Sequence, residues 1–170
     1  MKSKGFTLIE LIVYVAVFAI LITTITLFAI AFIKTTAKNR IKKEVVLGAY
    51  SAMNSIIYEI KRANNIYTPT SVFNNISGQL SLETSQGLPS GEEITYLDFY
   101  LDSDNKLYIK REGQNPQILI SENLKVTNLE FEHLDSTIDS VQINLTAEYD
   151  ATVSEYQYSY SLSSSASLRR

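Results

Sequence analysis

The N-terminal part of the chain is a run of apolar residues long enough to cross a lipid bilayer. Residues 6–33 carry one charged side chain, Glu10, among aliphatic, aromatic and threonine residues. As an α-helix this run would be roughly 42 Å long, because each residue adds about 1.5 Å. A bilayer core needs roughly 20 such residues. A membrane-spanning helix is therefore the first structural expectation.

Three kinds of segment share this apolar character. A secretory signal has an apolar core of about 7–15 residues followed by a small-residue cleavage site, and this run is longer and lacks such a site. A single-pass anchor fits the length, and Lys2 and Lys4 would hold its short end in the cytoplasm. An anchor leaves Glu10 unexplained, because a carboxylate in a membrane segment costs a few kcal/mol. Alternatively, Glu10 lies near the interface and its side chain reaches water.

The stretch KGFTLIEL at residues 4–11 resembles the class III leader of type IV prepilins and type II secretion pseudopilins. The resemblance implies that a prepilin peptidase cuts on the cytoplasmic side between Gly5 and Phe6, and that the new amino group of Phe6 is methylated. Lys2 and Lys4 match the basic leader, and Glu10 matches the family's acidic residue at mature position five. The resemblance thus makes Gly5 and Phe6 the cleavage site and Glu10 an assembly residue.

A positive amine at Phe6 would give the Glu10 carboxylate a partner. In a bundle of such helices, the carboxylate of one subunit can neutralise the amine of its neighbour, although pairing within one chain is also open. Breaking a buried pair costs several kcal/mol. We therefore expect this contact to set the axial register between subunits.

The remainder of the chain predicts an α+β, pilin-like fold in which one long N-terminal helix packs on an antiparallel β-sheet head. The expected division is a leader at 1–5, a transmembrane helix segment at 6–33, an amphipathic helix at 34–66 and a β-rich periplasmic or extracellular head at 67–170. Apolar residues recur at three- and four-residue steps in the second helical segment. They are Val45, Gly48, Ala49, Ala52, Met53, Ile56, Ile57, Ile60 and Ala63.

Strand patterns follow a loop marked by Gly78, Gly87, Pro89 and Gly91. Short runs of β-branched and aromatic residues between turn residues favour strands. These runs are EEITYLDFYLD, KLYIKRE, QILIS, VTNLEFEHL, DSVQINLTAEY and YQYSYSLSSS, with hairpin connections at DSDNK and REGQNP. In the first run, Ile94, Tyr96, Phe99 and Leu101 alternate imperfectly, as in a half-buried strand.

Charge is segregated along the chain. Residues 34–62 have seven Lys or Arg against two Glu, a local charge of +5, whereas residues 63–170 have six basic and fifteen acidic side chains, a local charge of −9. The basic segment can meet lipid headgroups or acidic neighbours, or form an ordinary solvated face. The acidic head argues against direct nucleic-acid binding, which rests on Lys and Arg contacts to phosphates.

The head offers no convincing catalytic or metal-binding group. Asp102–Asn105 resembles the start of a calcium loop but lacks its later glycine and glutamate, so a polar hairpin turn is favoured. His133 is the single histidine, and the chain has no cysteine. One cluster is acidic and fits a solvated strand face: Glu130, Glu132, Asp135 and Asp139. The other consists of tyrosines and fits packing on a strand, although exposed tyrosines would form an adhesive surface. These are Tyr149, Tyr156, Tyr158 and Tyr160.

The sequence also favours one position within the family. Many major pilins have a proline where this chain has Leu27, and the run YIKREG…ILISENLKVTNLEFEHL resembles minor subunits of the J-type or PilW-like kind. This implies a non-enzymatic minor subunit that initiates or caps a type IV pilus-like or type II secretion filament, without cofactor or metal. Alternatives are a pilus-displayed adhesin or DNA-uptake subunit, or an enzyme displayed on a pilin stem.

The resemblance also implies partners and a location. The expected partners are a prepilin peptidase, other pilin or pseudopilin subunits, an inner-membrane assembly platform and membrane lipid. The chain would span the inner membrane once, with its N-terminus in the cytoplasm and its head outside, and would then enter the filament.

Overall fold

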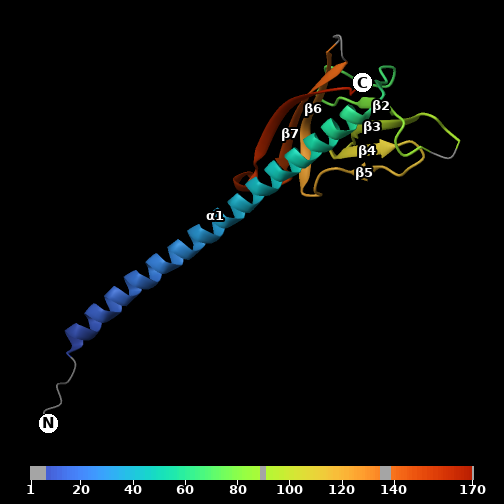
Figure 1. The fold of residues 1–170 in the computed structure, drawn as a ribbon. Helices are drawn as coiled ribbons and strands as arrows, with labels where there is room; N and C mark the ends of the chain where they lie inside the picture. Colours follow the sequence, from blue (N-terminus) through green and yellow to red (C-terminus); the bar gives the residue numbers. More distant parts are fainter. Residues whose placement is uncertain (1–6, 89–90, 135–138, 170) are drawn as a thin grey trace. The chain divides into compact units, whose positions relative to one another are not determined.

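The computed structural model describes residues 7–88, 91–134 and 139–169. The chain divides into two compact units, Met1–Arg40 and Ile41–Arg170, which we call the stem and the head. The long helix α1 (Leu8–Arg62) begins in the stem and also forms the first element of the head. Among the described residues of the stem, Thr7 precedes the helix. Figure 1 shows α1 followed by the strands of the head.

The head portion of α1 buries one stripe of residues. Six helical positions have at most 4% of their surface exposed, so the periodic apolar stripe predicted from the sequence is confirmed. They are Val45, Ala49, Ala52, Met53, Ile56 and Ile60. The helix ends at Arg62, and Asn64 then donates its N–H to the Glu83 carbonyl at 2.8 Å. Hydrogen bonding to a strand therefore replaces the helical bonds directly after α1.

The first sheet of the head contains five antiparallel strands in the order β1-β2-β3-β4-β5. Their bounds are β1 (Asn65–Ile66), β2 (Leu80–Thr84), β3 (Thr95–Leu101), β4 (Leu107–Arg111) and β5 (Gln117–Ile118). The connection between β3 and β4 is tight: Asn105 has a φ of 58°. Gly113 supplies the left-handed residue between β4 and β5, with a φ of 71°.

The second sheet contains three antiparallel strands in the order β6-β7-β8. β6 (Leu124–Leu134) and β7 (Ser140–Tyr149) pair along most of their length, with a register shift between Val126 and Asn128. A short 3-10 helix, η1 (Ser154–Tyr156), precedes β8 (Ser159–Ser167).

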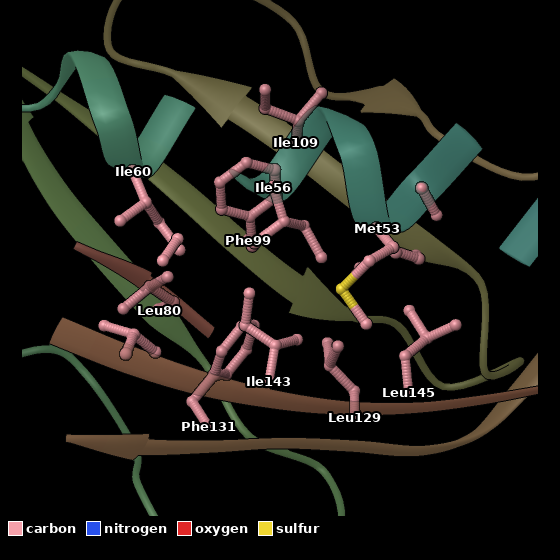
Figure 2. Close-up of a cluster of buried hydrophobic side chains, with 14 of the residues drawn as sticks. Met53, Ile56, Ile60, Leu80, Phe99, Ile109, Leu129, Phe131, Ile143 and Leu145 are labelled. Atoms are coloured by element: carbon pink, nitrogen blue, oxygen red, sulfur yellow. The ribbon is translucent and has the colours of Figure 1, made fainter. Parts of the chain in front are cut away.

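One hydrophobic core joins the helix to both sheets. In the head, α1 lies between strands β2–β5 and strands β6–β7 (Figure 1). Figure 2 shows Met53 and Ile56 of α1 close to Phe99 of the first sheet and to Phe131 and Ile143 of the second. The α+β, pilin-like layout of one long N-terminal helix on antiparallel sheets is therefore confirmed.

Three details differ from the sequence-based expectations. The strands form two sheets instead of one, and β2 occupies part of the segment expected to be a loop. The predicted alternation in β3 is wrong at its start, because the buried residues are Thr95, Leu97 and Phe99 while Ile94 is 44% exposed. Pairing of Phe99 with Ile109 of β4 sets which face of β3 meets the core.

Candidate functional site

The N-terminal segment is the candidate site, and its described part begins at Thr7. Gly5 and Phe6, the predicted cleavage and methylation residues, lie outside the described residues. Glu10 lies in the first turn of α1 and is exposed. The Glu10 N–H is 3.1 Å from the Thr7 carbonyl and 3.4 Å from Thr7 Oγ1. Thr7 thus caps the helix start.

Thr7 and Glu10 have the spacing of a capping box, in which a Thr is followed three residues later by Glu. A carboxylate in the first helical turn also interacts favourably with the positive end of the helix dipole. Glu10 therefore has a local stabilising role besides any intermolecular one. The sequence reasoning missed this role, although the Thr-x-x-Glu pattern itself signals it.

The stem helix is apolar and continuous. In the described residues, Leu8–Arg62 is the helix long and apolar enough to cross a membrane, and its most apolar window has no buried residue. Four threonine hydroxyls in the stem donate to carbonyls one turn earlier, as expected for threonine in a helix. They include Thr23 to Ala19 at 2.8 Å and Thr26 to Ile22 at 2.9 Å. These polar groups are satisfied without water.

The basic segment reaches into the head, where Lys42 and Glu44 of α1 contact later segments of the chain. The Lys42 ammonium lies 5.5 Å from the ring centre of Tyr158, a cation–π distance. Glu44 accepts hydrogen bonds from Ser121 at 3.0 Å and from the Asn123 side chain at 3.1 Å. These contacts hold the first head turns of α1 against the loop before β6 and the segment before β8.

The Asp102–Asn105 segment forms the predicted hairpin turn. Asp102 Oδ1 accepts the N–H groups of Asp104 at 3.0 Å and Lys106 at 2.7 Å. The carboxylate is thus used to close the turn between β3 and β4. Across the described residues, no group of three or more acidic, histidine or cysteine side chains could hold a metal ion.

His133 and its acidic neighbours lie at the end of β6. The His133 ring stacks on Phe73 at 5.5 Å between centres, and its Nε2 lies 3.6 Å from Asp139 Oδ1. Glu130 accepts a hydrogen bond from Asn144 at 3.2 Å, while Asp135 lies outside the described residues. Glu132 is exposed and Glu130 is partly exposed, which fits the solvated strand face that the sequence favoured for the acidic cluster.

The C-terminal tyrosines pack mainly against the core. Tyr149, Tyr158 and Tyr160 are partly buried and contact the hydrophobic cluster, which confirms the packing prediction for these three. Tyr160 donates a hydrogen bond to the Tyr50 hydroxyl at 3.4 Å, with the rings 6.0 Å apart. This bond, the largest cause, together with burial, raises the pKa of Tyr160.

A polar groove runs between α1 and the edge of the first sheet. Its walls include Ser55, Tyr58 and Gln117, and the ion pair between Glu59 and Arg111 lies in it. Its contacts join the helix to β4.

Together, the β-rich head and one long N-terminal helix that is apolar enough to cross a membrane give the layout of an anchored filament subunit. Residues 1–26 match the family model described as the prokaryotic N-terminal methylation motif. This match supports the type IV prepilin and pseudopilin family, which the sequence predicted. No curated protein and no solved structure matched the chain.

The match has three implications. The motif supports a type IV pilin-like or pseudopilin subunit, which is a structural kind of protein. The motif implies processing by a prepilin peptidase and assembly with other pilins. The motif and the apolar helix fit anchoring in the inner membrane, followed by entry into a filament.

Proposed function

We propose that the chain is a minor pilin or pseudopilin that initiates or caps a filament. The observation that carries this proposal is the methylation motif at residues 1–26 on an apolar helix in which Glu10 is the one charged residue between residues 6 and 33. Leu27, in place of a proline, supports a minor position: α1 is an unbroken helix there. The two-sheet head is the part of the chain that would contact the heads of other subunits.

The proposed chemistry begins at Gly5. Cleavage between Gly5 and Phe6 creates a positive amine, and methylation of that amine keeps its charge. The carboxylate of Glu10 in one subunit then pairs with the Phe6 amine of its neighbour. An unpaired carboxylate in lipid is costly, so pairing favours the helix in a bundle over the isolated helix. The pairing also sets the axial register between neighbouring helices.

The two roles of Glu10 can be separated experimentally. Glu10→Gln keeps a side chain that completes a capping box but removes the charge, whereas Thr7→Ala removes the cap and keeps the charge. We expect Glu10→Gln to abolish or strongly reduce filament incorporation while the chain remains in the membrane. We expect Thr7→Ala to incorporate nearly as well as the unmodified chain.

The measurement is immunoblotting of sheared filaments and membranes from cells expressing each full-length variant. Glu10→Asp is the matched control, since it keeps the charge on a shorter side chain. Normal incorporation of Glu10→Gln would contradict the pairing role. Loss of incorporation in Thr7→Ala but not in Glu10→Gln would assign Glu10 to capping alone.

A further inference from the structure

Strand β8 lies at an edge of the second sheet. Among the residues that the structure describes, β8 pairs along its whole length with β7 and with no other strand. Its register is unbroken from Ser159 to Ser167, so no bulge twists the edge away. In Figure 1 this strand, drawn in red, lies beside β7 on the side away from β6.

The hydrogen-bonding pattern shows which backbone groups of β8 point outward. Tyr149 donates its N–H to the Tyr158 carbonyl at 3.0 Å, and Leu168 donates to the Asp139 carbonyl at 3.0 Å. Antiparallel residues alternate between bonded and non-bonded pairs. Even-numbered residues of β8 therefore bond to β7. The N–H and C=O groups of five residues point away from it: Ser159, Ser161, Ser163, Ser165 and Ser167.

This edge lacks the devices that normally prevent strand pairing. Natural proteins protect edge strands with Lys, Pro, bulges, short length or a covering segment. The β8 sequence SYSLSSSAS has neither charge nor proline, and the flanking charged residues are Glu155 and Arg169. The outer backbone edge of this nine-residue strand, with its five exposed serines, is thus unprotected against pairing with another strand.

The other sheet edges in the described residues are protected. Asn74 donates to the Phe131 carbonyl at 2.8 Å, and Gly78 donates to the Leu129 carbonyl at 2.7 Å, so residues 74–78 cover the outer edge of β6. β1 and β5 each have two residues. The open edge of β8 is therefore a specific feature of this strand in the described structure.

The side chains along β8 leave room for another strand. Ser161 shares a hydrogen bond with Thr146 at 2.9 Å, and Ser163 donates to the Asn144 side chain at 2.7 Å, so these hydroxyls are held on β7. A neighbouring strand lies about 4.8 Å away, which short serine side chains permit. On the other face of the sheet, Tyr160 and Leu162 are partly buried against the core, so a charged side chain of a partner strand would lose hydration there.

We propose that β8 receives an extended, uncharged strand from the head of a different pilin-type subunit and so enlarges the three-stranded sheet. Five outward N–H groups and five outward carbonyls at strand spacing match a polypeptide backbone, which is the basis of β-strand addition. The proposal rests on the proposed function, because it names the head contact that the filament subunit makes.

Symmetry favours a different subunit as the partner of β8. Pairing of β8 with β8 of a second copy would use the same surface twice, and such isologous contacts close into a dimer. A filament requires heterologous contacts. In the described residues the chain offers no second open strand of comparable length to pair with β8.

Hydrogen exchange tests the pairing directly. Full-length chain in purified filaments is compared with detergent-solubilised monomer, and deuterium uptake is followed in peptides covering residues 159–167. We expect about five more protected amides in the filament, one for each outward N–H. Unchanged uptake in filament-bound chain would overturn this inference alone. Absence of the chain from filaments would overturn the proposed function and this inference with it.

Two variants of one residue provide an independent test. The Ser165 N–H points away from β7, so Ser165→Pro removes an outward donor without breaking a β7 bond. Ser165→Thr is the control, because it keeps the donor. If the two variants have equal unfolding temperatures, we expect Ser165→Pro to enter filaments about tenfold less, or less still, than Ser165→Thr. A tenfold difference corresponds to roughly 1.4 kcal/mol. Equal incorporation of the two variants would overturn the proposal.

A cysteine variant distinguishes a different subunit from a second copy. The chain has no cysteine, so Ser163→Cys introduces a unique thiol. Two-fold pairing of β8 centred on Ser163 would place the two Cα atoms about 5.5 Å apart, within the range for a disulfide. We expect no disulfide homodimer in oxidised native membranes or filaments. Efficient homodimer formation would overturn the choice of partner.

Discussion

The Arg111 guanidinium on β4 lies 2.7 Å from the Glu59 carboxylate on α1, although the two residues are 52 positions apart in sequence. The side chains are 30% and 12% exposed, respectively. This pair is therefore shielded more than an ordinary surface ion pair. It joins the last turns of the helix to the first sheet.

Removing the carboxylate of this pair should destabilise the head. Glu59→Ala leaves the Arg111 charge without its partner, and hydrogen bonds to charged groups contribute about 1.5–3 kcal/mol. We expect a loss of that size in urea unfolding of the full chain in detergent, followed by near-ultraviolet circular dichroism. Glu93→Ala, at an exposed position, should change stability by less than about 0.5 kcal/mol. Equal effects of the two variants would contradict the role given to Glu59.

The contact between α1 and the two sheets predicts a larger effect at Ile56. This side chain is fully buried, whereas Leu47 on the same helix is 57% exposed. Ile56→Ala should cost about 2–5 kcal/mol, because it removes buried methyl groups and leaves a cavity. Leu47→Ala should cost less than about 0.5 kcal/mol in the detergent-solubilised monomer. The same urea titration measures both, and a small loss for Ile56→Ala would contradict the described core.

Adding a side chain at Gly78 should lower the stability of the head. A Cβ there would lie 2.8 Å from the Leu129 carbonyl oxygen and 3.1 Å from the Val72 carbonyl oxygen. Because both atoms are backbone, Gly78→Ala should cost about 1–3 kcal/mol, as overpacking does. Ser77→Ala, at the adjacent exposed residue, serves as the control. Unfolding temperatures in detergent compare the two variants, and an unchanged value for Gly78→Ala would refute the close approach.

The Tyr50–Tyr160 hydrogen bond predicts a change with pH. This bond, with burial, raises the pKa of Tyr160 above its usual 10.0, so the folded state favours the neutral phenol. The stability from this group is complete below pH 10.0 and decreases as the pH rises through the folded-state pKa. Tyr50→Phe should bring the Tyr160 pKa closer to 10.0 in an ultraviolet absorbance titration. An unchanged titration curve would show that the bond does not control this pKa.

Sequence reasoning predicted most elements because their signals are local. The apolar stripe from Val45 to Ile60 and the alternation of Leu107 and Ile109 in β4 each follow from one segment. The turn at Asp102 likewise follows from short polar residues between two strand patterns.

The missed features depend on contacts between distant segments. β2 is short and buried on both faces, so LSLET has no alternation to reveal it. The division into two sheets depends on β6 pairing with β7 instead of with β5, and local periodicity does not encode pairing partners. The open edge of β8 follows from its position beyond β7, although the spacing of its serines is visible in the sequence.

The central claim is that this chain is processed as a prepilin and that Phe6 becomes its N-terminus. Mass spectrometry of the intact chain from native membranes and filaments tests this claim most directly. We expect a mature chain whose first residue is Phe6, with one methyl group on the Phe6 nitrogen. A mature chain that still begins at Met1 would contradict it.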